Sequence, residues 1–162
     1  MERNSVRVSC MTLSNVVAPG PPVGPGVAVK AMGLEVDAVT ASRVVGHMRL
    51  GPEHHTPWGI VHGGVYATAV ESAASLGASA AVADRGMVAV GLTNITHFLR
   101  PLTSGLVTVT AVALNQGRSQ QLWQVNITDG EGRLIAHGEL RLQNLDINGM
   151  KSPSETGASN EH

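Results

Sequence analysis

Aromatic side chains are nearly missing from this chain of 162 residues. Trp, Tyr and Phe make up 2% of it, as Trp58, Tyr66, Phe98 and Trp123. So few rings leave little for stacking on bases, and a formal net charge of -1 creates no basic surface for phosphate backbones. We therefore expect no nucleic acid among its partners.

Cysteine is equally scarce, because Cys10 is the single one. One cysteine cannot form a disulfide within the chain. The N-terminal residues also lack the basic segment, apolar core and cleavage site of a secretory signal. These features predict a cytoplasmic protein.

Long apolar runs are absent except for residues 65–83. This stretch is rich in alanine, which inserts weakly into membranes, and it carries Glu71 near its middle. We therefore interpret it as a helix buried within protein, and we expect no membrane partner.

The composition, with 43% hydrophobic and 14% charged residues, is typical of a folded chain, and the length fits one domain. Residues 19–26 are all Pro or Gly except for one Val, which excludes regular structure. We therefore predict a flexible N-terminal arm over 1–29, a folded domain over 30–147 and a disordered polar tail over 148–162.

Apolar and polar residues alternate most strictly in 123–128 and 134–143, each pattern predicting a strand with one buried face. Turn sequences at 115–118 and 129–132 indicate hairpins. The full prediction has strands at 33–39, 43–50, 87–98, 106–114, 123–128 and 134–143, the last four consecutive and antiparallel, with one helix at 65–83.

One helix and about six strands indicate an α+β protein. The helix would be about 28 Å long. Because its residues are apolar or small on every side, it needs cover all round. A curved antiparallel sheet wrapped around it would provide that cover.

The start of this helix holds two consecutive glycines, Gly63 and Gly64. Free N–H groups at a helix start lie at the positive end of the helix dipole, so they can stabilise the oxyanion that develops on an attacked thioester carbonyl. His62, just before them, is interpreted as a capping residue, a general base or a metal ligand. His54, His55 and His62 match no known zinc spacing, so we expect no metal.

Glu71 is a single carboxylate within an apolar helix. Its role is structural if an arginine reaches it, and otherwise catalytic. Ser75 lies on the same face, at i+4, where it could hold a water beside the carboxylate or simply pack.

Several motifs together resemble the hotdog-fold acyl-CoA thioesterases of the phenylacetate-degradation type. That group includes the Arthrobacter-type 4-hydroxybenzoyl-CoA and the 1,4-dihydroxy-2-naphthoyl-CoA thioesterases. The matching segments are His62-Gly63-Gly64-Val65 with Glu71 nine residues after the histidine, and residues 94–101, 117–119 and 129–136.

The resemblance implies that Glu71 is nucleophile or general base and that the Gly63 N–H polarises the thioester carbonyl. His62 would shape the turn and Ser75 would lie near the attacking water. Thr56 stands where the family commonly has Gln or Asn. The implied substrate-binding residues are Thr56, Gly64, Asn94, His97, Arg100, Arg118 and Ser119, with the arginines directed at CoA phosphates, although Arg118 could also be a solvated turn residue.

Gly63 and Glu71 are too far apart along one helix to act on the same carbonyl, which predicts a homodimer with shared active sites. We further expect a homotetramer. No cofactor is expected, since CoA is part of the substrate. Two alternatives are a hotdog acyl-thioester hydratase or dehydratase, which the His62 to Glu71 spacing disfavours, and a non-catalytic acyl-CoA-binding module, which the retention of Glu71 disfavours.

Overall fold

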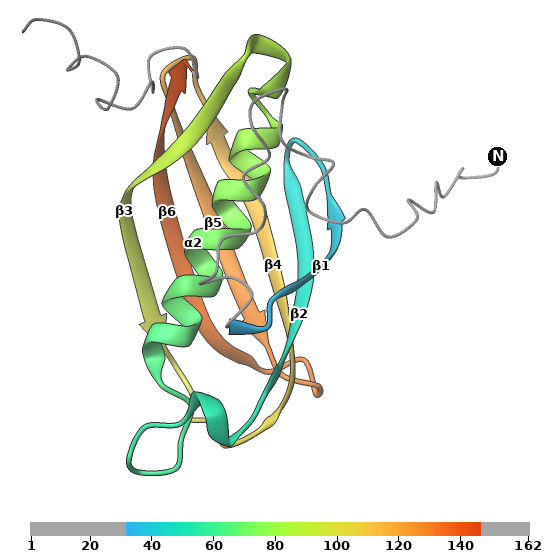
Figure 1. Cartoon of the computed structure of the whole chain (residues 1–162), viewed down its shortest axis with the longest axis vertical. Coiled ribbons are helices and arrows are strands. Elements are labelled where there is room, and N and C mark those ends of the chain that lie inside the picture. The colour runs from blue at the N-terminus through green and yellow to red at the C-terminus, as the bar shows by residue number, and fades with distance from the viewer. Residues whose placement is uncertain (1–31, 147–162) are drawn as a thin grey trace, which may run out of the picture.

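A computed structural model describes residues 32–146, and the predicted arm and tail lie outside these residues. The described part contains one long helix and a six-stranded antiparallel sheet (Figure 1). The helix is α2, Gly63–Ala80; the strands are β1 Glu35–Val39, β2 Arg43–Leu50, β3 Met87–Phe98, β4 Gly105–Gln116, β5 Gln120–Thr128 and β6 Leu134–Asp146, with 3-10 turns η2 Pro52–His54 and η3 Ala83–Arg85.

The sheet follows the order β1-β2-β4-β5-β6-β3. Strands β4, β5 and β6 form a meander joined by the two predicted hairpin turns. The four strands after the helix are consecutive in the chain and antiparallel, as expected, but β3 lies at the far edge of the sheet, beside β6 rather than beside β4. Each end of β3 is therefore joined to the rest of the chain by a crossing connection.

The helix boundaries differ from the predicted ones by two or three residues. Because His62 caps the helix, α2 begins at Gly63 rather than at residue 65, and it ends at Ala80. Strand β1 begins at Glu35 rather than at residue 33, since Gly33 has a φ of 73°, which interrupts an extended strand.

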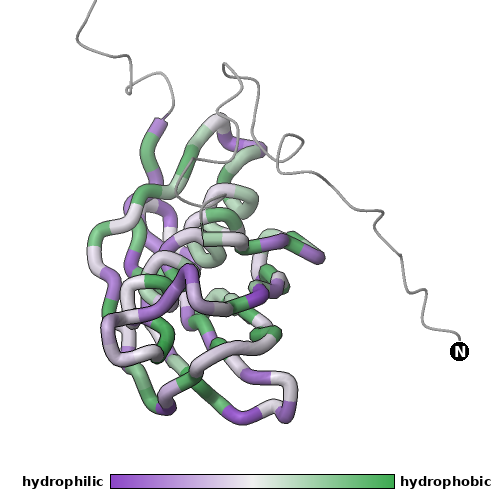
Figure 2. Tube along the Cα trace, turned by 60° about the horizontal axis from the view of Figure 1, so that its bottom comes forward, coloured by the Kyte–Doolittle hydropathy of each residue, from purple (hydrophilic) through white to green (hydrophobic). Residues whose placement is uncertain are grey.

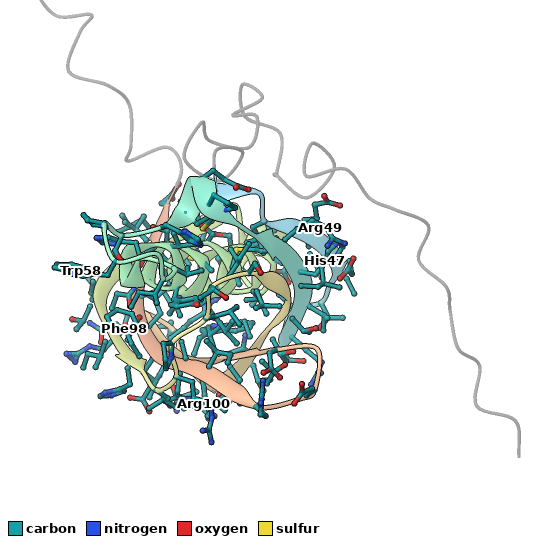
Figure 3. All side chains as sticks on the ribbon, turned by 90° about the horizontal axis from the view of Figure 1, so that it is seen from below. His47, Arg49, Trp58, Phe98 and Arg100 are labelled. Atoms are coloured by element: carbon teal, nitrogen blue, oxygen red, sulfur yellow. The ribbon has the colours of Figure 1, made fainter. Side chains whose placement is uncertain are left out.

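One face of α2 packs on the concave side of the sheet, which curves around it in the end-on view of Figure 3. The fully buried helix residues lie on this face: Tyr66, Ala69, Val70, Ala73, Ala74, Gly77 and Ala78. Other helix positions, among them Glu71 and Ser75, are only half-buried, and Glu71 lies on the flank of the helix that contacts β3. The expected cover all round the helix is therefore not completed within residues 32–146.

Along the strands, hydrophobic and hydrophilic residues alternate, as the changing colours of the trace in Figure 2 show. The inward residues include Val107, Val125 and Leu140, all fully buried. Trp123 lies on the helix at Gly77, where the ring occupies the place of a Cβ, so the helix approaches the sheet closely there.

A buried polar network, which the sequence analysis did not single out, holds the end of α2 to the sheet. Gln121 donates from Nε2 to the carbonyl of Ala78 at 2.9 Å and to Asn144 Oδ1 at 2.8 Å. The indole N–H of Trp123 donates to Gln121 Oε1 at 3.0 Å. Because these partners satisfy one another, the network can be buried at little cost.

The β5–β6 turn is organised by Asp129. Its Oδ1 accepts the N–H groups of Glu131 and Arg133, and its Oδ2 accepts from Arg133 Nε at 2.7 Å. Burial raises the pKa of this carboxyl, but the hydrogen bonds from Arg133 and from the backbone outweigh it, so the pKa lies below its usual value. The hairpin predicted at 129–132 is confirmed.

No helix within residues 32–146 is long and apolar enough to cross a membrane.

Candidate functional site

His62 caps the start of α2 and, among the described residues, leaves one backbone N–H group there without a partner. Nδ1 of His62 accepts a hydrogen bond from the Gly64 N–H at 2.8 Å, so capping is the role that the structure supports among the three considered. Within the described chain the Gly63 N–H has no acceptor. One backbone donor is thus left at the positive end of the helix dipole.

Phe98, at the end of β3, covers Gly63 from the side. A Cβ on Gly63 would lie 2.7 Å from Phe98 Cε2, so a glycine is what lets this ring approach. The ring is 57% exposed and lies 6.3 Å from that of Tyr66. Figure 3, which looks onto this end of the molecule, shows Trp58 and Phe98 on the same side of it.

An open hollow of about 510 Å³ adjoins the helix start. It is lined by Met32, Glu53, His54, His55, His62, Gly64, Val65 and Thr68. His55 Nε2 lies 2.6 Å from the Thr103 carbonyl, and His54 Nδ1 accepts the Gly51 N–H at 3.2 Å. These two histidines are therefore engaged with the backbone.

Thr56 lies in the loop before the helix and is engaged in the turn that it begins. Its Oγ1 accepts the Trp58 N–H at 3.3 Å, while its carbonyl accepts the Gly59 N–H at 3.0 Å. Trp58, 83% exposed, stands at the tip of this turn.

Glu71 lies halfway along α2, on the half-buried face, and contacts strand β3. Its Oε1 accepts from Ser75 Oγ at 3.4 Å and its Oε2 from Asn94 Nδ2 at 3.4 Å. Among residues 32–146 no arginine or lysine forms an ion pair with it. The structural alternative, an arginine partner, is therefore not realised within the described chain.

Gly63 and Glu71 are not brought together within one chain. They are eight residues apart on α2, which corresponds to about 12 Å along the helix axis. A carbonyl oxygen bound at the Gly63 N–H would lie beyond the reach of the Glu71 carboxylate of the same helix.

Asn94 and His97, both expected to bind substrate, lie on opposite faces of β3. Asn94 faces α2, where its amide contacts Glu71. His97 faces away and stacks on His137, with ring centroids 6.4 Å apart. An offset of three residues in a strand reverses the face, so His97 is separated from Glu71 by the sheet.

The predicted arginines lie in two different parts of the fold. Arg100 follows β3 and points outward in Figure 3. Arg118 and Ser119 lie in the β4–β5 turn, at the other end of α2 (Figure 1). There Arg118 lines a hollow of about 330 Å³ together with Arg85, which the sequence analysis missed.

Tyr66, near the start of α2, was not among the predicted site residues. Its hydroxyl is buried and has no hydrogen-bond partner among residues 32–146. Burial raises its pKa to about 12, so the phenol stays neutral at physiological pH. The sequence feature that could have drawn attention to Tyr66 is its position directly after His62-Gly63-Gly64-Val65, on the core face of the helix.

Comparison with known proteins identifies the family. Residues 59–136 match the family model described as the Thioesterase superfamily. A Mycobacterium tuberculosis protein named as a candidate esterase is 49% identical over 90 residues, covering 54% of this chain and 64% of that protein, less than two thirds of its length.

Two further relatives are covered more completely. The 1,4-dihydroxy-2-naphthoyl-CoA hydrolase of Listeria monocytogenes is 33% identical over 106 residues, 65% of this chain and 85% of that protein. The structure of a thioesterase from Haemophilus influenzae superposes with a TM-score of 0.72 and 31% identity, over 77% of this chain and 87% of that one. The expected hotdog fold and the resemblance to thioesterases are thereby confirmed, and the chain belongs to the Thioesterase superfamily.

Proposed function

We propose that this protein hydrolyses acyl-CoA thioesters to the free acid and CoA. One observation carries the proposal: within residues 32–146, the same helix presents a backbone N–H without an acceptor, at Gly63, and a half-buried carboxylate without an ion-pair partner, at Glu71. A CoA thioester as substrate is supported by the name of the Listeria relative, a CoA-thioester hydrolase. CoA enters as part of the substrate, so the proposal needs no cofactor.

In this proposal the Gly63 N–H binds the thioester carbonyl oxygen. Nucleophilic attack turns that oxygen into an oxyanion, and a fixed N–H at a helix start stabilises the developing charge more than it stabilises the ground state. The His62 cap occupies the Gly64 N–H and so leaves the Gly63 N–H as the donor for substrate.

Glu71 acts on the carbonyl carbon in one of two ways. As general base it takes a proton from water while the water oxygen bonds to the carbonyl carbon. As nucleophile it forms an anhydride that water then hydrolyses. In both cases the C–S bond breaks, and the CoA thiolate leaves and is protonated. The hydrogen bonds from Ser75 and Asn94 to the carboxylate are long, at 3.4 Å each, so its oxygens can still accept a proton or attack the carbonyl carbon.

The active site would be shared between two chains. A two-fold partner with an antiparallel helix brings its Glu71 to the carbonyl held at Gly63, and symmetry produces two such sites. Glu71 and its neighbour Ser75 are only half-buried within the described chain, so this side of α2 is accessible for such packing. We propose a homodimer as the working unit, within a cytoplasmic homotetramer.

The CoA phosphates would bind near Arg118. Arg118 and Arg85 line the same hollow, and neither has an ion-pair partner among the described residues. Two unpaired guanidinium groups suit phosphate oxygens, since each can donate two hydrogen bonds at once.

Substituting Arg118→Ala is expected to raise KM for CoA thioesters more than it lowers kcat, because a phosphate contact far from the carbonyl contributes uniform binding. The effect should be larger at low salt. Steady-state kinetics with CoA thioesters and with pantetheine thioesters, which lack the nucleotide, measures both. Equal losses on the two substrates would contradict a phosphate contact.

The experiment that tests the function is a panel of aryl- and alkyl-CoA thioesters assayed with a thiol-trapping dye. We expect release of CoA thiol from at least one class of acyl group. Tight binding of acyl-CoA without thiol release across the panel would instead support a non-catalytic acyl-CoA-binding module.

A further inference from the structure

Strand β3 forms a slot around the Glu71 carboxylate. We propose that three of its residues, Gly91, Asn94 and Thr96, are positioning residues that hold this carboxylate in its reactive orientation. The inference rests on the proposed role of Glu71 and goes beyond it, because it changes the role of Asn94 from substrate contact to support of the catalytic group.

Asn94 joins β3 to the helix that carries Glu71. Its Nδ2 donates to the Ala67 carbonyl at 2.9 Å and to Glu71 Oε2 at 3.4 Å. Ala67 is one turn before Glu71, so a single amide group contacts both the helix backbone and the carboxylate. Both donor positions of the amide are thereby directed at α2.

Thr96 supports the orientation of the Asn94 amide from the other side. Its hydroxyl donates to Asn94 Oδ1 at 2.7 Å, the shortest contact of this group. A flipped amide would place Oδ1 against the Ala67 carbonyl and the Glu71 carboxylate, acceptor against acceptor. The Ala67 carbonyl and the Glu71 carboxylate therefore keep the NH2 group on their side, and the Thr96 hydroxyl stabilises that orientation by donating to Oδ1.

Gly91 leaves the space that the carboxylate occupies. A Cβ at this position would overlap Glu71 Oε1 and would lie 3.1 Å from its Cδ. Backbone, and not a side chain, thus forms the wall of the slot.

An irregularity in β3 brings Gly91 and Asn94 to the same face. Residues three apart on a regular strand face opposite ways. The register between β3 and β6 shifts between Gly91 and Thr93, which inserts one extra residue and reverses the alternation. Such bulges are frequent beside active sites, where they redirect a side chain.

The slot restricts the carboxylate to one region beside β3, with Ser75 on the side of the helix. A catalytic group held in place loses less freedom on reaching the transition state, and a displacement of about 1 Å can cost about 100-fold in rate. Loss of the slot should therefore lower kcat and leave KM nearly unchanged, since none of these residues is assigned a contact with CoA.

The first test compares Gly91→Ala with Gly130→Ala. A Cβ at Gly130 would meet nothing within 4 Å, and its φ is not positive, so it controls for the change from glycine to alanine. We expect Gly91→Ala to lower kcat by about 10- to 100-fold with KM within about twofold, and Gly130→Ala to match the wild type. A folded Gly91→Ala variant with wild-type kcat would overturn the proposal.

The second test addresses the hydrogen bonds. Asn94→Asp keeps the size and the acceptor for Thr96 but replaces the donor to Glu71 by a second carboxylate, which repels it. Asn115→Asp, at an exposed position of β4, is its control. We expect kcat to fall about 10-fold or more in Asn94→Asp and in Thr96→Val, and to be retained in Thr96→Ser, which keeps the hydroxyl. Loss in Thr96→Ser equal to that in Thr96→Val would contradict a role for the hydroxyl.

A third readout does not depend on activity and so separates this inference from the proposed function. The side-chain amide signal of Asn94 in a 15N NMR spectrum, identified by its loss in Asn94→Asp, should shift in Glu71→Gln and in Thr96→Val and stay in place in Asn115→Asp. If no thioester is hydrolysed but the signal shifts, the slot stands and the proposed function fails. If thioesters are hydrolysed and the signal does not move, the slot is refuted.

Discussion

Replacing Glu71 by glutamine is expected to lower kcat for thioester hydrolysis by at least about 100-fold, the range typical of a positioned base or nucleophile. Glutamine has nearly the same size and keeps an oxygen for the Ser75 hydroxyl, but it can neither accept a proton from water nor attack the carbonyl. Loss of the negative charge breaks no ion pair, since Glu71 forms none among residues 32–146. Steady-state assays with the best substrate of the panel measure the loss.

Glu139→Gln is the matched control, because Glu139 is exposed on β6 and its side chain faces away from α2. This variant should retain wild-type kcat. Circular dichroism and the melting temperature show whether each variant is folded. Unchanged turnover in a folded Glu71→Gln variant, or a variant that simply unfolds, would assign Glu71 a structural role.

Much of the fold could be predicted because its determinants are local. Strict alternation marked β5 and β6, and the turn sequence at Asp129 marked the hairpin between them. The position of β3 could not be predicted, since its pairing with β6 joins residues 38 to 59 positions apart and leaves no local pattern. The open outer face of α2 was missed for a related reason: its small, weakly polar residues look like those of a helix that is covered all round.

The parts of the candidate site that could be predicted are those where the residue type alone indicates a chemical role. Two glycines at a helix start and a carboxylate in an apolar helix are visible in the sequence alone. Gly91 was not found, because only the bulge in β3 turns it toward Glu71. Arg85 and Arg118 are 33 residues apart, and only the fold brings them to the same hollow.

Mixing two inactive variants should restore activity if the active site is shared between two chains. Glu71→Ala removes the carboxylate, and Gly63→Pro removes the backbone N–H at a helix position that tolerates proline. In a mixed dimer, one of the two sites combines the intact Glu71 of one chain with the intact Gly63 of the other. Random reassociation makes half of the dimers mixed, so about a quarter of wild-type activity should return.

The proline ring in Gly63→Pro also displaces the neighbouring Phe98 side chain, so the control variant must cause the same displacement. A Cβ at position 63 contacts the Phe98 ring, which is 57% exposed and can swing outward. Gly63→Ala makes the same displacement but keeps the N–H, so it should retain far more activity than Gly63→Pro. If it does not, the loss comes from Phe98 and not from the missing donor.

Subunit exchange has to be shown independently, by mass spectrometry of a tagged and an untagged chain. If both variants are folded and exchange subunits while the mixture stays inactive, Gly63 and Glu71 act within one chain. That outcome would refute the shared site and the argument from the separation of about 12 Å along one helix. Recovery near a quarter therefore supports an arrangement in which the helix start of one chain binds the carbonyl and the partner supplies the carboxylate.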